Sequence, residues 1–112
     1  MGKNTLGEFE EIVMLTVAIL FENAYGITIK EEIETRLKRK VSVGALRTAL
    51  KRLEKKGYLE SAFGEATAIR GGKRKRYFKV TPYGKNVLEE VMKTRRQLWE
   101  SIPSVAFDFK FA

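Results

Sequence analysis

The hydrophobic period of this 112-residue chain changes at Gly57, and that change constrains the fold more than any other feature. Before Gly57, apolar residues recur every three or four positions, which is the spacing of amphipathic helices. After Gly57, two short segments, 59–63 and 76–80, alternate with a period of two, as β-strands do. A helical spacing resumes after Thr81-Pro82, because Thr suits an N-cap and Pro suits the first helical position. We therefore expect an α+β fold that is mostly helical and has one small β-hairpin.

Local signals give the expected ends of each element. Helices are expected over residues 6–21, 25–39 and 43–56, and a last helix runs from residue 82 to before residue 103. The expected caps are Asn4 or Thr5 for the first helix, Ser42 for the third, and Gly57 as its left-handed end. In the third helix the buried stripe is Leu46, Leu50 and Leu53. Residues 64–75 join the two strands as a long basic turn. This order describes a winged helix-turn-helix. In such a fold the third helix can enter the major groove of DNA, while the turn of the hairpin reaches the DNA backbone beside it.

The positive charge of the chain is concentrated in its middle. The whole chain has a net charge of +8, but residues 36–79 hold fifteen basic and three acidic residues, a net charge of +12. The remaining 68 residues therefore carry a net charge of −4. A basic region between acidic ends is typical of a surface that binds a polyanion such as nucleic acid. The alternative is a surface that only keeps the protein in solution.

The residue types that are missing exclude most catalytic chemistry. The chain has no Cys and no His, so thiolate nucleophiles, cysteine zinc sites, and the commonest general base and metal ligand are absent. We expect no enzyme activity, no cofactor and no metal. The longest nearly apolar run, residues 12–21, is half of the roughly 20 residues that a membrane span needs, so we expect no membrane association. The absence of cysteine fits a reducing cytoplasm, where we expect the protein to act.

Several segments also resemble a known family. These are LGEFEEIVMLTVAIL, AYGITIKEEIE, VSVGALRTALKRLEKKGYLES, GEATAIRGGKRKRYFKVTPYGK and RRQLWESI. Together, over residues 6–102, they are similar to the PadR-type transcriptional regulators of prokaryotes. The resemblance implies a homodimer whose C-terminal helix packs against the partner subunit, and repression by occupation of a promoter. Arg47 departs from the pattern, because the family commonly has an aromatic residue there; the departure bears on the recognition surface and not on the fold.

The resemblance also implies which residues face DNA. On the third helix these positions are Ser42, Gly44, Ala45, Arg47, Thr48 and Lys51. Arg47 and Lys51 could contact guanine or phosphate, and Thr48 a thymine methyl group or phosphate. In the hairpin the basic residues are Lys73, Arg74, Lys75 and Arg76, where alternation places Lys73 and Lys75 on one face and the two arginines on the other. The alternatives are a merely solvated helix face and a hairpin kept soluble by its charge.

The C-terminal part of the chain is rich in apolar residues. Met92, Leu98 and Trp99 are candidates for a dimer interface. Since some PadR-like regulators hold aromatic compounds between their subunits, Trp99 is also a candidate contact for a small aromatic effector; an ordinary interface anchor is the alternative. In the tail, Phe107, Phe109 and Phe111 alternate with polar residues along an expected extended segment, which would dock on the subunit's own helices, dock across the dimer, or fray.

The sequence thus predicts three parts: a winged helix-turn-helix domain at 5–80, a dimerisation helix at 81–102 and an aromatic tail at 103–112. The expected function is that of a sequence-specific, homodimeric repressor of transcription that binds a palindromic operator in double-stranded DNA. One alternative is a sequence-indifferent nucleic-acid-binding module, in which charge alone gives affinity. Another is an effector-binding interaction protein whose DNA contacts are secondary. Preference for one palindrome that survives added salt separates the first from the sequence-indifferent module.

Overall fold

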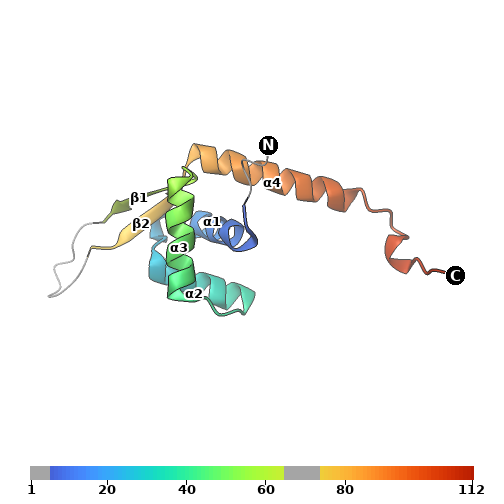
Figure 1. The fold of residues 1–112 in the computed structure, drawn as a ribbon, viewed down its shortest axis with the longest axis horizontal. Helices are drawn as coiled ribbons and strands as arrows, with labels where there is room; N and C mark the ends of the chain where they lie inside the picture. The colour runs from blue at the N-terminus through green and yellow to red at the C-terminus, as the bar shows by residue number, and fades with distance from the viewer. Residues whose placement is uncertain (1–5, 65–73) are drawn as a thin grey trace.

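In the computed structural model, which describes residues 6–64 and 74–112, helices surround a small core and one hairpin projects from it (Figure 1). In chain order the elements are α1 (Glu8–Leu20), the 3₁₀ helix η1 (Phe21–Asn23), α2 (Gly26–Leu37), α3 (Val43–Lys55), β1 (Leu59–Phe63), β2 (Arg76–Val80), α4 (Pro82–Glu100) and the 3₁₀ helix η2 (Ala106–Asp108). This order confirms the mostly helical α+β fold with a winged helix-turn-helix arrangement. Figure 1 shows the hairpin at one end of the body and α4 leaving it at the other.

The first two helices are shorter than the sequence predicted. Helix α1 begins after Gly7, whose N–H donates to the Glu10 carboxylate at 3.3 Å, and it ends before Phe21, which has a left-handed φ of +56°. The expected caps Asn4 and Thr5 lie outside the described residues. Helix α2 ends at Leu37 instead of residue 39, because Lys38 takes the left-handed conformation with φ of +55°. Neither position is a glycine, so the sequence carries no signal for these two helix ends.

The core is formed by the facing sides of the first three helices and the base of the hairpin. Helix α1 contributes Val13, Met14 and Val17, which are all buried. Helix α2 adds Ile29 and Ile33. Ile19, four residues after Leu15, and Leu37, four residues after Ile33, have the spacing of buried helix positions, but both are exposed. At 100° per residue Ile19 lies 200° from Val17, and Leu37 is the last residue of α2, where the chain turns away.

The hairpin is antiparallel and is attached to the start of α2. Strand β1 pairs with β2 from Leu59 opposite Val80 to Phe63 opposite Arg76. The N–H of Phe78 donates to the carbonyl of Ala24 at 2.8 Å, and Phe78 is buried. Beside this bond the rings of Tyr25 and Tyr77 meet edge to face, with centroids 5.3 Å apart. The hairpin is therefore held against α2 as well as continuing from α3.

Helix α4 belongs to the core only at its beginning. Thr81 caps it by accepting a hydrogen bond from the N–H of Gly84 at 2.9 Å, and Pro82 is its first residue, as predicted. Val87 and Leu88 are buried and Val91 and Met92 are half-buried, whereas residues 93–100 are exposed. Arg95, in this exposed part, forms an ion pair with Glu11 at 2.9 Å. Within the described residues, none of the helices combines the length and the apolar character that crossing a membrane requires.

The C-terminal tail differs from the extended strand that its alternation suggested. Residues Ala106–Asp108 form η2, because the N–H groups of residues 106 and 108 donate to carbonyls three positions earlier. All three phenylalanines of the tail are exposed in the single chain. Phe107 contacts only the ring of Trp99 among aromatic groups of the described residues, at a centroid distance of 6.4 Å. In this structure the tail therefore does not dock on the core of its own chain.

The start of α4 packs closely on the backbone of Tyr58, the residue before β1, so we expect Gly84→Ala to destabilise the fold. A Cβ at position 84 would overlap the carbonyl oxygen of Tyr58 and lie 3.0 Å from its Cα. Because the obstacle is backbone, we expect a loss of about 1–3 kcal/mol in the free energy of unfolding, measured by urea denaturation. The control is Gly44→Ala, where a Cβ meets nothing within 4 Å and helix propensity should raise stability by up to about 1 kcal/mol. Equal stability of Gly84→Ala and the wild type would contradict this packing.

Candidate nucleic-acid interface

Helix α3 has one buried side and one exposed side. Leu46, Ala49, Leu50 and Leu53 are buried, so the predicted leucine stripe is confirmed with one alanine added. The opposite side carries the residues that the sequence assigned to DNA, and all are exposed: Gly44, Ala45, Arg47, Thr48 and Lys51. Ser42 is also exposed and caps the helix as predicted, accepting a hydrogen bond from the N–H of Ala45 at 3.0 Å. A capped, exposed helix start of this kind can approach another molecule without disturbing the core.

The turn before α3 is fixed by a carboxylate of α2. Glu34 accepts a hydrogen bond from the N–H of Val41 at 2.9 Å and forms an ion pair with Lys30 at 3.1 Å. The Val41 N–H, and after it the Lys30 side chain, lower the pKa of Glu34 below its ordinary value of 4.5. Val41 is itself buried. Glu34 thus holds the segment between α2 and α3 against α2.

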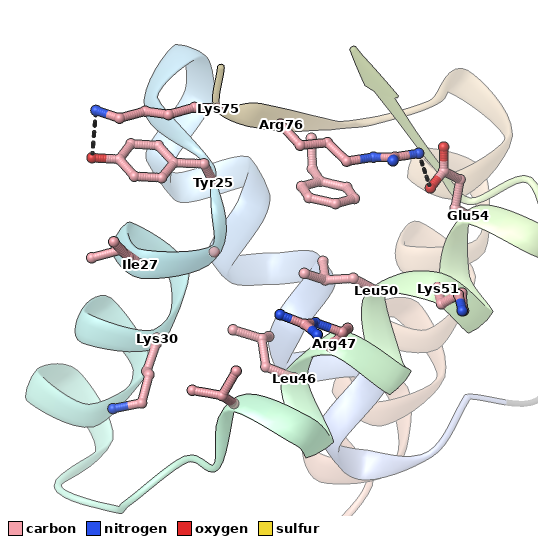
Figure 2. Close-up of a pocket in the computed structure, with 13 residues that line it drawn as sticks. Tyr25, Ile27, Lys30, Leu46, Arg47, Leu50, Lys51, Glu54, Lys75 and Arg76 are labelled. Atoms are coloured by element: carbon pink, nitrogen blue, oxygen red, sulfur yellow. Dashed lines mark hydrogen bonds and ion pairs between the residues drawn. The ribbon is translucent and has the colours of Figure 1, made fainter. Parts of the chain in front are cut away.

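A groove of about 590 Å³ lies between α2, α3 and β2 (Figure 2). Its apolar surface comes from residues of all three elements: Ile27, Val43, Leu46, Leu50 and Phe78. Its charged residues are five cations and one acid: Lys30, Arg47, Lys51, Lys75, Arg76 and Glu54. Figure 2 shows Arg47 between the two leucines of α3, with Tyr25 and Lys75 on the opposite wall. The groove therefore joins α3 to the hairpin through a positively charged surface.

The cations of this groove differ in whether they already have partners. Arg76 pairs with Glu54 at 3.5 Å. The ammonium group of Lys75 lies 4.5 Å from the centroid of the Tyr25 ring and donates to its hydroxyl at 3.4 Å. Arg47 and Lys51 form no ion pair with any acid of the described residues. These two cations are the ones that an incoming anion can engage without breaking an existing contact.

The other side of α3 faces a second, more open groove beside the start of α1. Gly44, Ala45 and Thr48 line it, together with Arg52. Arg47 and Lys51 lie in the first groove, so the predicted positions of α3 divide between two flanks. At 100° per residue Arg47 lies 200° from Ala45 around the helix, which is why the two residues line different grooves.

The hairpin cations lie on its two faces as the alternation predicted. The guanidinium groups of Arg74 and Arg76 lie 5.4 and 5.2 Å from the centroid of the Phe63 ring, so these arginines share one face. Lys75 points to the other face, toward Tyr25. Lys73 and the Gly71-Gly72 pair lie outside the described residues.

Two groove residues of α2, Ile27 and Lys30, were absent from the predicted site. Tyr25, at the start of α2, also lines the groove and was not among the predicted residues. All three residues belong to the segment AYGITIK, which resembles the family but carries no charge pattern that marks a surface. Their part in the groove depends on how α2 packs beside the hairpin, which no local spacing reveals.

The candidate residues at the C-terminal end lie apart from this surface. Met92 is half-buried, and the side chains of Leu98 and Trp99 are 66% and 68% exposed. Figure 1 shows this end of α4 extending away from α3 and the hairpin. In the described part of the chain, no three residues of the His, Cys, Asp and Glu types are grouped so that they could hold a metal ion.

Comparisons with known proteins agree with this arrangement. A sequence model of the transcriptional regulator PadR-like family matches residues 14–90. A protein of Lysinibacillus sphaericus, named only as uncharacterized, is 33% identical over 98 residues, which are 86% of this chain and 85% of that protein. A solved PadR-like transcription factor from Bacteroides fragilis is 26% identical with a TM-score of 0.71, over 88% of this chain and 89% of that one. A PadR family regulator from Clostridium difficile is 27% identical with a TM-score of 0.63, over 82% and 92% of the two chains.

The position of Glu34 predicts a pH-dependent effect of Glu34→Gln. The carboxylate has a lower pKa in the folded chain, so its stabilising effect is complete above the ordinary glutamate pKa and is lost as pH falls through the lowered value. Glu34→Gln should therefore lower the thermal unfolding midpoint at neutral pH, and the gap to the wild type should narrow as the solution is acidified. Glu31→Gln, an exposed glutamate of the same helix, is the control and should change little. A gap that stays constant with pH would contradict this role of Glu34.

Proposed function

Because the chain belongs to the PadR-like family of transcriptional regulators, we propose that it is a homodimeric repressor that binds a palindromic operator. Membership of the family implies regulation of transcription by DNA binding. The observation that supports the finer proposal most is the exposed side of α3, where Arg47 and Lys51 have no acidic partner among the described residues. In this proposal the protein acts in the cytoplasm, where the DNA of a prokaryotic cell lies.

In the proposed complex α3 enters the major groove. Its first turn is capped by Ser42 and presents Gly44 and Ala45, the smallest side chains available, with nothing within 4 Å of the place a Cβ would take at Gly44. No contact within the chain requires glycine there, and glycine in a helix costs up to about 1 kcal/mol relative to alanine. Close approach of a DNA strand would explain why glycine stands at position 44. Arg47, Thr48 and Lys51 then reach base edges or phosphates.

The hairpin is proposed to hold the flanking backbone. Arg74 and Arg76 present two guanidinium groups on one face, and Lys75 an ammonium group on the other. The proposed set also includes Lys73. Phosphate contacts of this kind fix the register of a protein on DNA and add affinity without reading sequence.

The proposed dimer uses the C-terminal half of α4. Leu98 and Trp99, with Phe107 beside Trp99, leave exposed apolar surface that a second subunit can cover. The division into residues 5–80 for DNA, 81–102 for dimerisation and 103–112 as an aromatic tail follows from this proposal. Trp99, with Met92 and Leu98, is also the place where a small aromatic effector would lie between subunits.

Substitution of Arg47 tests how α3 reads DNA. Operator sites are first selected from a random DNA pool, and wild type and Arg47→Ala are then titrated with the selected site and with random DNA. If the guanidinium spans O6 and N7 of a guanine, the selected site should lose about 1–3 kcal/mol of binding free energy per half-site, and random DNA much less. Lys55→Ala removes another exposed cation of α3 and is the matched control for charge.

Two results would contradict parts of this proposal. Equal losses on selected and random DNA would show that Arg47 contacts phosphate instead of a base. Failure of the random pool to yield any motif, with binding that disappears as salt is added, would favour the sequence-indifferent module.

The mass of the protein in solution tests the dimer. Light scattering should give about 26 kDa, twice the 12.8 kDa of one chain. A variant with both Leu98→Glu and Trp99→Glu should approach the mass of one chain, because two carboxylates would have to be buried in the interface. Ile27→Glu, which changes another exposed apolar residue, should leave the mass unchanged. A wild-type monomer at micromolar concentration would exclude a symmetric operator complex.

A further inference from the structure

The hairpin cation Arg76 is held by two side chains, one from β1 and one from α3. Its Nε–H donates to the Ser61 hydroxyl at 2.9 Å, and its Nη2 lies 3.5 Å from the Glu54 carboxylate. The Ser61 hydroxyl in turn donates to the same carboxylate at 2.6 Å. Figure 2 shows Arg76 reaching from β2 toward Glu54. These three residues therefore form a closed network that joins both strands of the hairpin to α3.

The place of Glu54 in α3 is unfavourable for an acid. Glu54 is the last residue but one of the helix, and the helix dipole disfavours a negative charge in the last turn. Its side chain is also only 34% exposed, so it has lost part of its hydration. The hydrogen bonds from Ser61 and Arg76 offset both costs. The position of this carboxylate is thus explained by the two groups that it holds.

The ring of Phe63 gathers two guanidinium groups at the same face of the hairpin. Arg76 stands directly opposite Phe63 in the strand register, and Arg74 precedes it by two residues. Their guanidinium carbons lie 5.2 and 5.4 Å from the ring centroid. Each contact is a favourable cation–π interaction, but the two like charges repel each other. Glu54 balances only one of them, so an anion from another molecule would balance the second.

The network leaves one edge of the Arg76 guanidinium available for that anion. Nε and Nη2, which bond to Ser61 and Glu54, form one edge of the planar group. The other edge consists of Nη1 and the second hydrogen of Nη2, and it meets no acceptor among the described residues. Two N–H groups on one edge suit a phosphate, which they bind through two parallel hydrogen bonds. The Arg76 side chain is 49% exposed, so a phosphate can reach it.

The network also fixes Arg76 relative to the exposed side of α3. Glu54 follows Arg47 by seven residues, or about two helical turns, so both lie on the same flank of α3, about 10 Å apart along the axis. A guanidinium tied to Glu54 therefore keeps a constant distance from Arg47. A phosphate bound to it would set the register in which α3 meets the base edges.

We propose that Glu54 and Ser61 are positioning residues, which hold the Arg76 guanidinium so that its second edge receives one DNA phosphate at a fixed place beside α3. This inference rests on the function proposed above, and it adds two residues without positive charge to the DNA-binding surface. Without them the DNA itself would have to immobilise Arg76. Ordering one long side chain on binding costs about two- to tenfold in affinity per subunit.

The position of Arg76 is tested first without DNA, by the exchange of its Nε–H proton with water in the isotopically labelled full chain. Exchange should be about tenfold slower than for Arg96, an exposed arginine of α4 that has no hydrogen bond or ion pair in the described part of the chain. Ser61→Ala removes the acceptor, and Glu54→Ala removes the group that orients it. Each should raise the exchange rate of Arg76 at least about threefold. Equal rates for Arg76 and Arg96 in the wild type would overturn the proposal.

Affinity for a random-sequence duplex then tests the effect on DNA. Removing an acid from a DNA-binding surface ordinarily raises the affinity for phosphate. Glu60→Ala, which removes an exposed acid of β1, is the matched control and should bind at least as tightly as the wild type. Glu54→Ala should instead bind about two- to tenfold more weakly per subunit, because the network is lost. Ser61→Ala should weaken binding in the same direction and replaces Glu54→Ala if that variant fails to fold.

Two further variants separate positioning from charge and from a merely structural role. Glu54→Gln keeps an acceptor oxygen for Ser61 and Arg76 and should bind DNA at least as tightly as the wild type. In an Arg76→Gln background, Glu54→Ala should no longer weaken binding. Arg76→Gln itself should flatten the slope of log affinity against log salt by about one unit per subunit, because one phosphate contact is lost.

The contrary outcomes are distinct from failure of the proposed function. If the wild type binds DNA and Glu54→Ala binds it equally well or more tightly, positioning by Glu54 is overturned and the regulatory function stands. Weakening by Glu54→Ala in the Arg76→Gln background, or an unchanged salt slope for Arg76→Gln, would overturn the positioning of Arg76 for phosphate. A wild type that binds no DNA would contradict the proposed function and this inference with it.

Discussion

The burial of one side of α3 is the constraint on which the rest of this structure depends. Leu46, Leu50 and Leu53 pack into a core made with α1 and α2, and Leu53 is fully buried. Deleting a core leucine of this kind costs about 2–5 kcal/mol, so the helix cannot rotate about its axis to hide its other side. That other side must face outward, and it is where small and basic residues are found together. The buried side of α3 therefore packs into the core, and its exposed side carries the residues proposed to contact DNA.

The hairpin is placed by the same core. Phe78 is buried and its N–H is bonded to Ala24, so β2 lies against the start of α2 and cannot drift from α3. This attachment brings the hairpin cations and Arg47 to a common groove.

Much of the fold could be predicted from local signals. The Ser42 cap, the left-handed Gly57 and the Thr81-Pro82 helix start each act within one or two turns, and each is confirmed. The ends of α1 and α2 could not be predicted, because Phe21 and Lys38 have positive φ angles that residues with side chains do not favour. The groove was missed for a related reason, since the contribution of Ile27 depends on contacts among three separate elements. The 3₁₀ helix in the tail could not be predicted, because alternation alone does not separate an extended segment from a short 3₁₀ helix. The proposed roles of individual residues in DNA binding stay predictions.

The central claim is that the exposed side of α3 and the hairpin meet DNA, and backbone amide signals of the isotopically labelled protein test it residue by residue. On addition of a selected operator duplex, the largest changes in chemical shift should fall on Gly44, Ala45, Thr48 and Lys75. The amide of Leu53 at the centre of the core should shift little, and the C-terminal end of α4 should behave likewise. Changes concentrated on α4 and the aromatic tail, with α3 unaffected, would contradict the account.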